Sequence, residues 1–576
     1  MHRKMAQEKR PHANDWVERT LAGLTPEQKA GQLLNVCFFG LNLESLPPIL
    51  ERMKRFHLGG YFQVKNTLKN LRECNEVIQR EVEVPMLVAS DFEAGVGYML
   101  EGGTLFPRQM ARGDANDAKA EYEIGRITAV EGRAAGIHMT AAPVFDIHVN
   151  PAYPDGNTRA WGDDPAVIAR LGVANVKGLQ SHGMAALAKH FPGSGSTEMD
   201  QHMAAAWVPE SRERMTRLYH RPYAEAIRRA DLLGVMVSHL DVPSLITERH
   251  PVDGLPVPAS LSKEVVTGIL KKKLGFRGMT MTDAFNMGGV NNRYDRGEAA
   301  LKAIQAGNDN ILCFDPGTLE QEYEAILKGA RDGAIPAKRL DDAVRRVLTV
   351  KQKLGLDRDR GVPLPPDRYR EAVTPLRHEA FTRRVTDRAV TVLRNDRKRL
   401  PLRGMAGKKA LVISAFNPDR ELAVRKGHKP YDDAVPGLLR ARGLIVDEIE
   451  IVPDFADDAK AKLNAAIEAS DIVFLDIFGI PSYGIGTILP HRAVMELFYR
   501  GILHCGKPVV VSLFGDPYIA RYAPSAEMLV LTFDETCFSQ ASAVAVIFGE
   551  ITAKGRSPVA IPPWFPRGSG LKLSAR

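Results

Sequence analysis

Residues 185–202, AALAKHFPGSGSTEMDQH, combine side-chain types and a spacing that suit acid–base chemistry on a bound substrate. An apolar run ends in Lys189 and His190, a loop rich in Gly and Ser follows, and Asp200 and His202 close the stretch. Pro lacks an N–H donor and Gly favours unusual backbone angles, so the loop can continue neither a helix nor a strand ladder. A carboxylate two residues before a histidine can orient the imidazole and raise its basicity. An Asp-x-His pair alone is more often part of a solvated surface loop, but the preceding cation pair favours a site.

Other polar residues directly follow apolar runs, where strands are expected to end. Asp91 follows MLVAS, Asp146 follows TAAPVF, His239 follows VMVS and Asp283 follows MTMT. Each Asp alone could be a helix cap. Their repetition predicts a set of catalytic groups beyond the carboxyl ends of barrel strands.

Short apolar runs alternate with helical patterns through the first part of the chain. The strands are expected at residues 32–38, 60–64, 86–90, 139–144, 185–188, 234–238, 279–282 and 310–314. Helices are expected between them, among others at residues 117–135, 165–182, 212–230, 262–274 and 297–306. Apolar strands that alternate with helices in this way predict a (β/α)8, TIM-like barrel.

The rest of the chain predicts a smaller α/β domain. A helix over 338–355 precedes a polar, Pro-rich stretch that is typical of a linker. A helix over 375–391 then leads to strands at residues 410–415, 445–451, 472–477, 509–514 and 528–533. An open parallel sheet between helices, a three-layer sandwich, is expected. The predicted domains are a catalytic barrel (1–355), a linker (356–375) and a C-terminal α/β domain (376–576). The glycines of residues 479–486 lack the spacing of a nucleotide-binding fingerprint.

Three motifs resemble those of family 3 glycoside hydrolases, in the branch of the bacterial β-N-acetylglucosaminidases. The first is KHFPGSG followed by Asp-x-His. The second, residues 258–287, is similar to the family's strand that ends in a nucleophilic aspartate. The third, NTRAWG at residues 157–162, resembles the family's sugar-binding motif. The match runs from about residue 24 to 555 with the family's spacing and covers nearly the whole chain.

The resemblance implies a retaining glycosidase with a covalent intermediate. Asp283 would be the nucleophile, and His202, with Asp200 as its partner, would be the acid/base. The sugar hydroxyls would be held by Asp91, Arg159, Lys189 and His190. We expect Lys189 and Arg159 also to hold the pKa of Asp283 down. The small loop residues are expected to let His202 swing in when substrate binds.

Part of the expected binding shell departs from the family pattern. The family reads D-x-E-G-G-R-V followed by a further Arg, where this chain has Val96 and Met99 in place of the two arginines. Ser194 stands where the family's KHFPGHG has its second His. The catalytic residues match, so the reaction type is better supported than the sugar.

Composition favours a globular protein without a nucleic-acid or membrane partner. The chain has 576 residues, 25% of them charged, and its net charge of +8 is not gathered in a basic stripe. No apolar run approaches the ~18–20 residues of a membrane span, and the N-terminus lacks the apolar core of a signal peptide. The cysteines are expected to be small buried hydrophobes. We therefore expect a cytoplasmic protein that uses no cofactor or metal and acts on a small carbohydrate, in an oligomeric state that the sequence leaves open.

The leading interpretation is a retaining β-N-acetylhexosaminidase that removes terminal β-linked N-acetylglucosamine, and two alternatives stay open. A family 3 β-glycosidase of other sugar specificity, or a glycoside phosphorylase, would keep the barrel and Asp283. Phosphate is admissible because His202, unlike a carboxylate, would not repel it. A catalytically silent sugar-binding protein would keep the fold and lose the chemistry.

Overall fold

The computed structural model describes residues 15–416, 433–451, 457–479 and 492–575. The N-terminal segment 1–14 and most of the glycine-containing segment 479–486 lie outside the described residues, so the expectations for them stay predictions.

Among the described residues, parallel strands close into a barrel in the order β1-β12-β11-β9-β7-β6-β4-β2. Their bounds are β1 (Leu34–Phe39), β2 (Gly60–Val64), β4 (Leu87–Ser90), β6 (Met139–Thr140), β7 (Ala185–Phe191), β9 (Gly234–Val237), β11 (Met279–Ala284) and β12 (Asn310–Cys313). The predicted barrel is therefore confirmed. Two strands differ most in length from the prediction: β6 is much shorter, and β7 continues through Lys189 and His190 to Phe191.

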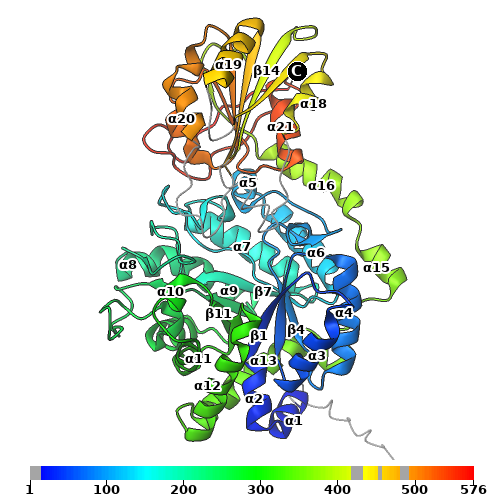
Figure 1. The fold of residues 1–576 in the computed structure, drawn as a ribbon, viewed down its shortest axis with the longest axis vertical. Helices are drawn as coiled ribbons and strands as arrows, with labels where there is room; N and C mark the ends of the chain where they lie inside the picture. The colour runs from blue at the N-terminus through cyan, green and yellow to red at the C-terminus, as the bar shows by residue number, and fades with distance from the viewer. Residues whose placement is uncertain (1–14, 417–432, 452–456, 480–491, 576) are drawn as a thin grey trace, which may run out of the picture.

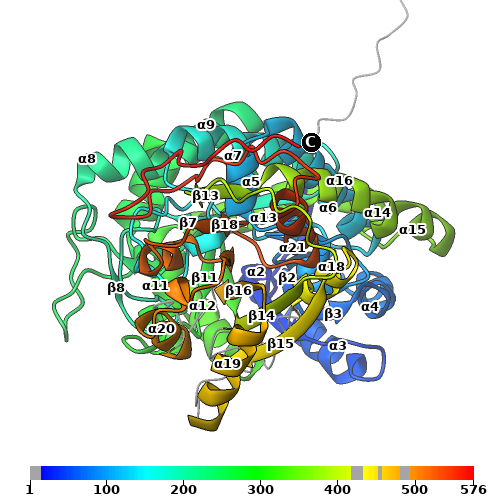
Figure 2. The same ribbon diagram turned by 90° about the horizontal axis from the view of Figure 1, so that it is seen from above.

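Helices surround the barrel and connect its strands (Figures 1 and 2). They include α1 (Asp15–Gly23), α2 (Pro26–Gln32), α3 (Leu46–Arg55), α4 (Leu68–Glu81), α5 (Gln109–Ala115), α6 (Ala118–Ala134), α7 (Pro165–Gln180), α9 (His220–Ala230), α11 (Arg296–Ala306), α12 (Leu319–Asp332) and α13 (Ala337–Lys353). Thr25 caps α2 through a complete capping box with Gln28. The predicted helix at 262–274 is a π-helix, η5 (Glu264–Lys273).

The second domain is built on a sheet of order β13-β18-β17-β16-β14-β15. Its strands are β13 (Thr391–Asn395), β14 (Lys409–Phe416), β15 (Ile445–Ile451), β16 (Ile472–Gly479), β17 (Val509–Gly515) and β18 (Met528–Leu531). One face packs its apolar side chains against α19 (Asp457–Ala469) and α20 (Arg492–Tyr499), and the other against α18 (Val435–Arg440) and α21 (Cys537–Ile547). The three-layer arrangement is as predicted (Figure 2).

The expectation that the strands of the second domain's sheet are all parallel is wrong at one edge. β13 pairs antiparallel with β18, and its first residue, Thr391, was assigned to the end of a helix. That helix, α16 (Pro375–Arg388), ends earlier because the next residues enter the sheet. The sequence TVLRN is rich in β-branched and apolar residues, which suits an edge strand.

The chain passes from the barrel to the second domain through α14 (Leu356–Asp359), α15 (Pro366–Ala372) and α16 along one side of the molecule (Figure 1). Ionic contacts join the two domains directly. The guanidinium of Arg108 pairs with Glu535, and Arg567 Nη1 lies 2.8 Å from Asp163 Oδ1. Where one domain ends and the next begins stays a prediction.

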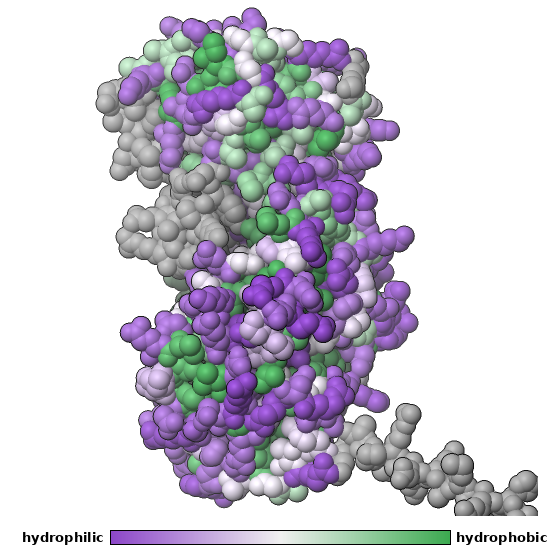
Figure 3. Space-filling view, turned by 90° about the vertical axis from the view of Figure 1, so that its right-hand side faces the viewer, coloured by the Kyte–Doolittle hydropathy of each residue, from purple (hydrophilic) through white to green (hydrophobic). Residues whose placement is uncertain are grey.

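The visible surface is mostly hydrophilic, with hydrophobic residues in small groups over both domains (Figure 3). Of the helices that the structure describes, none combines the length and apolar character needed to cross a bilayer. The cysteine expectation holds only in part. Cys37, Cys74 and Cys313 are buried, but Cys505 is partly exposed and Cys537 is exposed at the start of α21.

Candidate active site

A cavity of about 390 Å³ opens at the carboxyl ends of the barrel strands. Ionisable side chains from several βα connections line one part of it, and apolar side chains line the rest. The charged or ionisable lining residues are Lys65, Asp91, Glu93, Tyr98, Asp155, Arg159, Lys189, His190, His202 and Asp283. This is the end of a barrel where catalytic groups collect.

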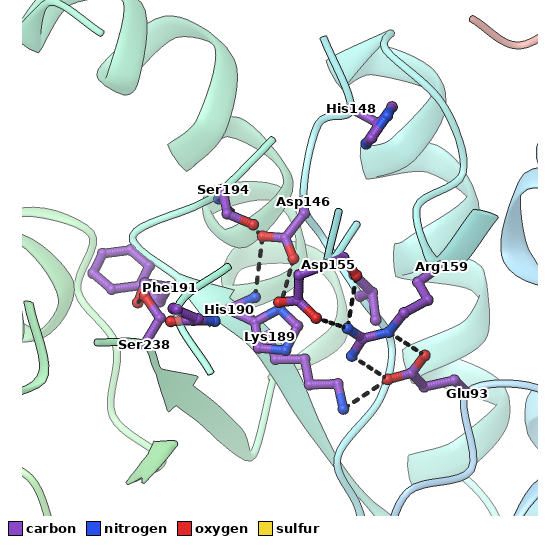
Figure 4. Close-up of polar contacts among 12 residues, drawn as sticks. Glu93, Asp146, His148, Asp155, Arg159, Lys189, His190, Phe191, Ser194 and Ser238 are labelled. Carbon is purple, nitrogen blue, oxygen red and sulfur yellow. Dashed lines mark hydrogen bonds and ion pairs between the residues drawn. The ribbon is translucent and has the colours of Figure 1, made fainter. Parts of the chain in front are cut away.

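Two cations and three carboxylates that line the cavity form a chain of ion pairs, of which Figure 4 shows the part from Lys189 through Glu93 and Arg159 to Asp155. Lys189 Nζ lies 2.6 Å from Asp91 Oδ1 and 2.8 Å from Glu93 Oε1. Arg159 donates to both oxygens of Glu93, at 3.0 Å and 2.8 Å, and its other arm pairs with the Asp155 carboxylate. Burial raises the pKa of Glu93, but the charges of Arg159 and Lys189 outweigh it and hold that pKa well below its usual range. The network thus presents fixed charges that can hydrogen-bond polar groups of a molecule in the cavity.

Strand β7 delivers Lys189 and His190 to the cavity, and Asp146 fixes the second of them. Asp146 Oδ2 lies 2.6 Å from His190 Nδ1, and Asp146 Oδ1 accepts backbone N–H groups from His190 and Ser194 (Figure 4). Burial raises the pKa of Asp146, but the His190 charge and these hydrogen bonds outweigh it and lower that pKa. His190, with its Nδ1 held by Asp146, also lines the cavity.

The loop glycines are needed for close packing in this conformation. Gly193 and Gly195 have φ angles of +117° and +124°. A Cβ at Gly195 would lie 1.8 Å from the Ile147 carbonyl oxygen, and one at Gly193 would lie 2.7 Å from the Tyr219 side chain. His202 already lines the cavity here, so its expected swing toward a bound substrate stays a prediction.

Asp200 and His202 form the predicted dyad. Asp200 Oδ1 lies 2.7 Å from His202 Nδ1 and also accepts the His202 backbone N–H at 2.8 Å. The Asp200 side chain is buried, whereas that of His202 is 23% exposed. Burial lowers the pKa of His202, but Asp155, Asp200 and Asp283 outweigh it and raise that pKa above its ordinary value. The dyad therefore favours the imidazolium, which is the form that can protonate a leaving group.

Asp283 lies near the end of β11 and lines the same cavity. Its Oδ1 accepts the Ala284 backbone N–H at 2.9 Å, and its side chain is nearly buried. Lys189 and Arg159, the expected cationic neighbours of Asp283, are themselves paired with Asp91, Glu93 and Asp155. His202 interacts electrostatically with Asp283, and the expected effect of the two cations on Asp283 stays a prediction.

The apolar side of the cavity comes mainly from the opposite half of the barrel. Its residues include Phe39, Phe62, Met99, Met236, Met287 and Phe314. Phe39 and Phe314 meet edge to face with ring centroids 5.5 Å apart, and Phe39 is 52% exposed. Met99, at one position of an expected arginine, lines the cavity, whereas Val96 is fully buried in the core.

One group of side chains has the composition of a small metal site. Asp155, Asp200 and His202 place one potential ligand atom each within 4.8 Å of one another. Those atoms are engaged with each other and with Arg159: Nδ1 of His202 lies between the two carboxylates, and Asp155 pairs with the guanidinium. We interpret the group as a hydrogen-bonded acid/base assembly.

The structure brings the predicted residues together. Asp91, Arg159, Lys189, His190, His202 and Asp283 line one cavity, with Asp200 directly behind His202. His239, another polar residue after a strand, makes different contacts. Its Nδ1 lies 2.7 Å from Ser260 Oγ and its Nε2 lies 3.1 Å from the Ala284 carbonyl oxygen. Burial lowers its pKa to about 4. These contacts of His239 connect the segment after β9 to the end of β11.

Sequence reasoning missed two members of the charged network. Glu93 stood in the quoted D-x-E motif without a role, and Asp155 lies in Pro154-Asp155-Gly156, which is typical of a turn. A carboxylate to balance Arg159 could have been sought, but spacing alone does not identify it.

The comparisons with known proteins agree with this geometry. Residues 25–350 match the model of the glycosyl hydrolase family 3 N-terminal domain. A "Beta-N-acetylglucosaminidase/beta-glucosidase" of Cellulomonas fimi is 27% identical over 94% of this chain and 95% of its own length.

Two solved structures are similar along nearly their whole length. A "Beta-glucoside phosphorylase BglX bound to 2FGlc" has a TM-score of 0.85 and 27% identity, over 96% of this chain and 97% of its own. A glycoside hydrolase family 3 β-N-acetylglucosaminidase of Paenibacillus sp. str. FPU-7 has a TM-score of 0.79 and 27% identity, over 94% and 99%. With the barrel, the second domain and the charged cavity in place, this chain belongs to glycoside hydrolase family 3.

Proposed function

We propose that the protein is a retaining β-N-acetylhexosaminidase that releases terminal β-linked N-acetylglucosamine. One observation carries the proposal: Asp283, the Asp200–His202 dyad and the Arg159–Lys189 network face a single cavity. A nucleophilic carboxylate, a proton donor and groups that hold hydroxyls are the three requirements of a retaining glycosidase.

In the first step, an Asp283 oxygen attacks the anomeric carbon while the bond from that carbon to the leaving oxygen breaks. The His202 imidazolium gives its Nε2 proton to the leaving oxygen, because Nδ1 is held by Asp200. In the second step, neutral His202 takes a proton from water as the water oxygen attacks the anomeric carbon. The Asp283 carboxylate is then released.

The N-acetylglucosamine specificity is supported by the named relatives and by the two-sided cavity. Asp91, Arg159, Lys189 and His190 offer charged hydrogen bonds to hydroxyls. The apolar side offers contact to a methyl group such as that of an acetamido substituent.

Phosphorolysis is a second candidate, favoured by a specific observation. The proposed acid/base is an imidazole whose raised pKa favours a cation, and Lys65 is a further cation in the cavity. A phosphate anion could approach such a site in place of water, whereas a general-base carboxylate would repel it. A solved structure with a TM-score of 0.85 carries the name of a phosphorylase.

A panel of aryl β-glycosides with N-acetylgluco-, gluco-, galacto- and xylo-configured sugars, assayed with and without phosphate, tests these functions. The proposal predicts turnover of the N-acetylglucosaminide and formation of the free sugar in both conditions. Formation of a sugar 1-phosphate, with a marked rate increase in phosphate, would make the protein a phosphorylase. Preference for another sugar would refute the hexosaminidase specificity, and turnover of none would favour a sugar-binding protein.

A further inference from the structure

Asp155 contacts both the sugar-binding network and the acid/base dyad. Its side chain is 1% exposed, and its carboxylate pairs with Arg159, whose Nη1 also donates to the Asp155 backbone carbonyl at 2.8 Å. Asp155 Oδ1 lies 3.7 Å from His202 Nδ1, close enough for strong electrostatic attraction. On the other side, the Tyr153 hydroxyl donates to Asp155 Oδ2 at 3.2 Å, and its oxygen lies 2.8 Å from Ser194 Oγ.

The carboxylate is held in its charged form. Burial raises the pKa of Asp155, but the charges of Arg159, His202 and His190 outweigh burial and repulsion from Glu93, and hold that pKa well below its usual range. A buried, fixed anion beside an imidazole favours the imidazolium.

The groups that face His202 come from several elements. Asp200 is on its own loop, Asp155 is on the connection that precedes Arg159, and Asp283 is on β11; all three favour the imidazolium. His239, after β9, also interacts with His202, and its own pKa of about 4 keeps it neutral near pH 7.

We propose that Asp155 is a positioning residue that couples the sugar-binding Arg159 to the acid/base His202. This inference rests on the proposed function. One carboxylate fixes the guanidinium that meets the sugar and helps keep His202 protonated for the leaving group. Glycone recognition and proton donation thus share a support that the Asp200–His202 dyad alone would not supply.

The test compares Asp155→Asn with Glu93→Gln as a matched control. Each variant removes one carboxylate from Arg159, but only Asp155→Asn removes a carboxylate that faces His202. Both are expected to raise KM. Only Asp155→Asn should move the basic limb of kcat/KM to lower pH, with about a tenfold loss above neutral pH for substrates with poor leaving groups. An equal shift in Glu93→Gln, or no shift in Asp155→Asn, would overturn the inference.

A measurement without substrate separates this inference from the proposed function. The His202 ring resonance, assigned by its loss in His202→Gln, is titrated by NMR in the unmodified protein and in the folded Asp155→Asn protein. We expect the midpoint to fall in Asp155→Asn, whether or not the protein turns over any glycoside. An unchanged midpoint refutes the coupling. A midpoint that EDTA changes in the unmodified protein would refute it too, since the three groups would then hold a metal.

Discussion

Two Asp–His pairs lie at this site, and their surroundings give them different roles. In the first, Asp146 holds His190 at 2.6 Å, and in the second Asp200 holds His202 at 2.7 Å, each through Nδ1. The His190 side chain is 5% exposed and lies on β7, whereas that of His202 is 23% exposed and lies on a loop. A carboxylate beside a histidine therefore does not by itself define an acid/base.

The second pair differs through the set of carboxylates around it, and of these Asp155 interacts with His190 as well. Asp155 and Asp283 both face His202 and raise its pKa. Asp146, by contrast, also accepts hydrogen bonds from the backbone N–H groups of His190 and Ser194, and these hydrogen bonds fix the loop. The first pair is suited to holding a hydroxyl and the second to moving a proton.

The largest effect is expected from the nucleophile, without which neither pair has a reaction to assist. Asp283→Ala should lower kcat by on the order of 10⁴ or more, because it removes the proposed covalent attachment point. Steady-state kinetics, with thermal unfolding to confirm the fold, measures this. Activity within tenfold of the unmodified protein would remove Asp283 from the mechanism.

The two histidines should differ in their dependence on the leaving group. His202→Ala should cost about 10²–10⁴-fold with alkyl or sugar leaving groups and far less with dinitrophenyl glycosides, since only the former need protonation. His190→Ala, the matched control, should cost a similar factor with all leaving groups because it affects the sugar. Kinetics over a leaving-group series measures this. Equal dependence on the leaving group in the two variants would contradict the assignment of different roles to the two histidines.

Removing the carboxylate partner of each histidine should change the pH dependence of kcat/KM for only one of the two pairs. The raised pKa of His202 means that the imidazolium persists to higher pH than in a free histidine. Asp200→Asn removes one cause, so the basic limb of kcat/KM should move to lower pH, with about a tenfold loss above neutral pH. Asp146→Asn should raise KM without moving that limb. A limb that moves equally in both variants would contradict the assignment.

Asp476, a buried carboxylate of the second domain, provides a contrast with the carboxylates of the site, because it lacks a cationic partner among the described residues. Asp476 on β16 is fully buried, and burial and then the charge of Asp433 raise its pKa well above its usual value. The unfolded chain ionises this group from about pH 4 upward while the folded protein keeps it protonated. The free energy of unfolding should therefore fall as pH rises above about 4.

Asp476→Asn should increase that free energy at neutral pH by on the order of 1 kcal/mol and weaken its pH dependence. Urea unfolding of both proteins at pH 5 and pH 8 measures this. If the variant were less stable at both pH values, the carboxylate would have a favourable native partner.

The smallest effect concerns Met99, which lines the cavity where an arginine was expected. Met99→Arg should improve kcat/KM for N-acetylglucosaminides by up to about tenfold, because a guanidinium that can donate several hydrogen bonds replaces an apolar side chain. Met99→Leu controls for the loss of methionine. Efficient turnover by the unmodified protein, unchanged in Met99→Arg, would show that another group already serves the position, with Lys65 as one cationic candidate in the same cavity.

Much of the fold could be predicted because its signals are local. Apolar runs of strand length, alternating with helical patterns, sufficed for the barrel and for most of the second sheet. The antiparallel edge strand β13 could not be distinguished from the end of α16, because its pairing with β18 is long-range in sequence. Strand lengths also depended on tertiary contacts, as β7 extends past the apolar run to include two polar side chains.

The site was predictable to the extent that its residues follow strands or stand in motifs. Asp91 follows β4, and Lys189, His190 and Asp283 lie near the carboxyl ends of β7 and β11, so the fold itself gathers them. Asp155 could not be found in this way, because a turn signal gives no indication of which distant charge the side chain will meet. The carboxylates that pair with Lys189 and Arg159 could not be identified for the same reason.

The most direct test of the central claim is to trap the glycosyl-enzyme intermediate. The protein is incubated with an N-acetylglucosaminyl fluoride that carries a second fluorine at C5, a modification that slows turnover of the intermediate, and is then digested for mass spectrometry. We expect a single covalent sugar on Asp283, with slow release as the intermediate turns over. A stable label on Asp91, Asp155, Asp200 or His202 would contradict the assigned roles, and turnover without any covalent adduct would argue against the double-displacement mechanism.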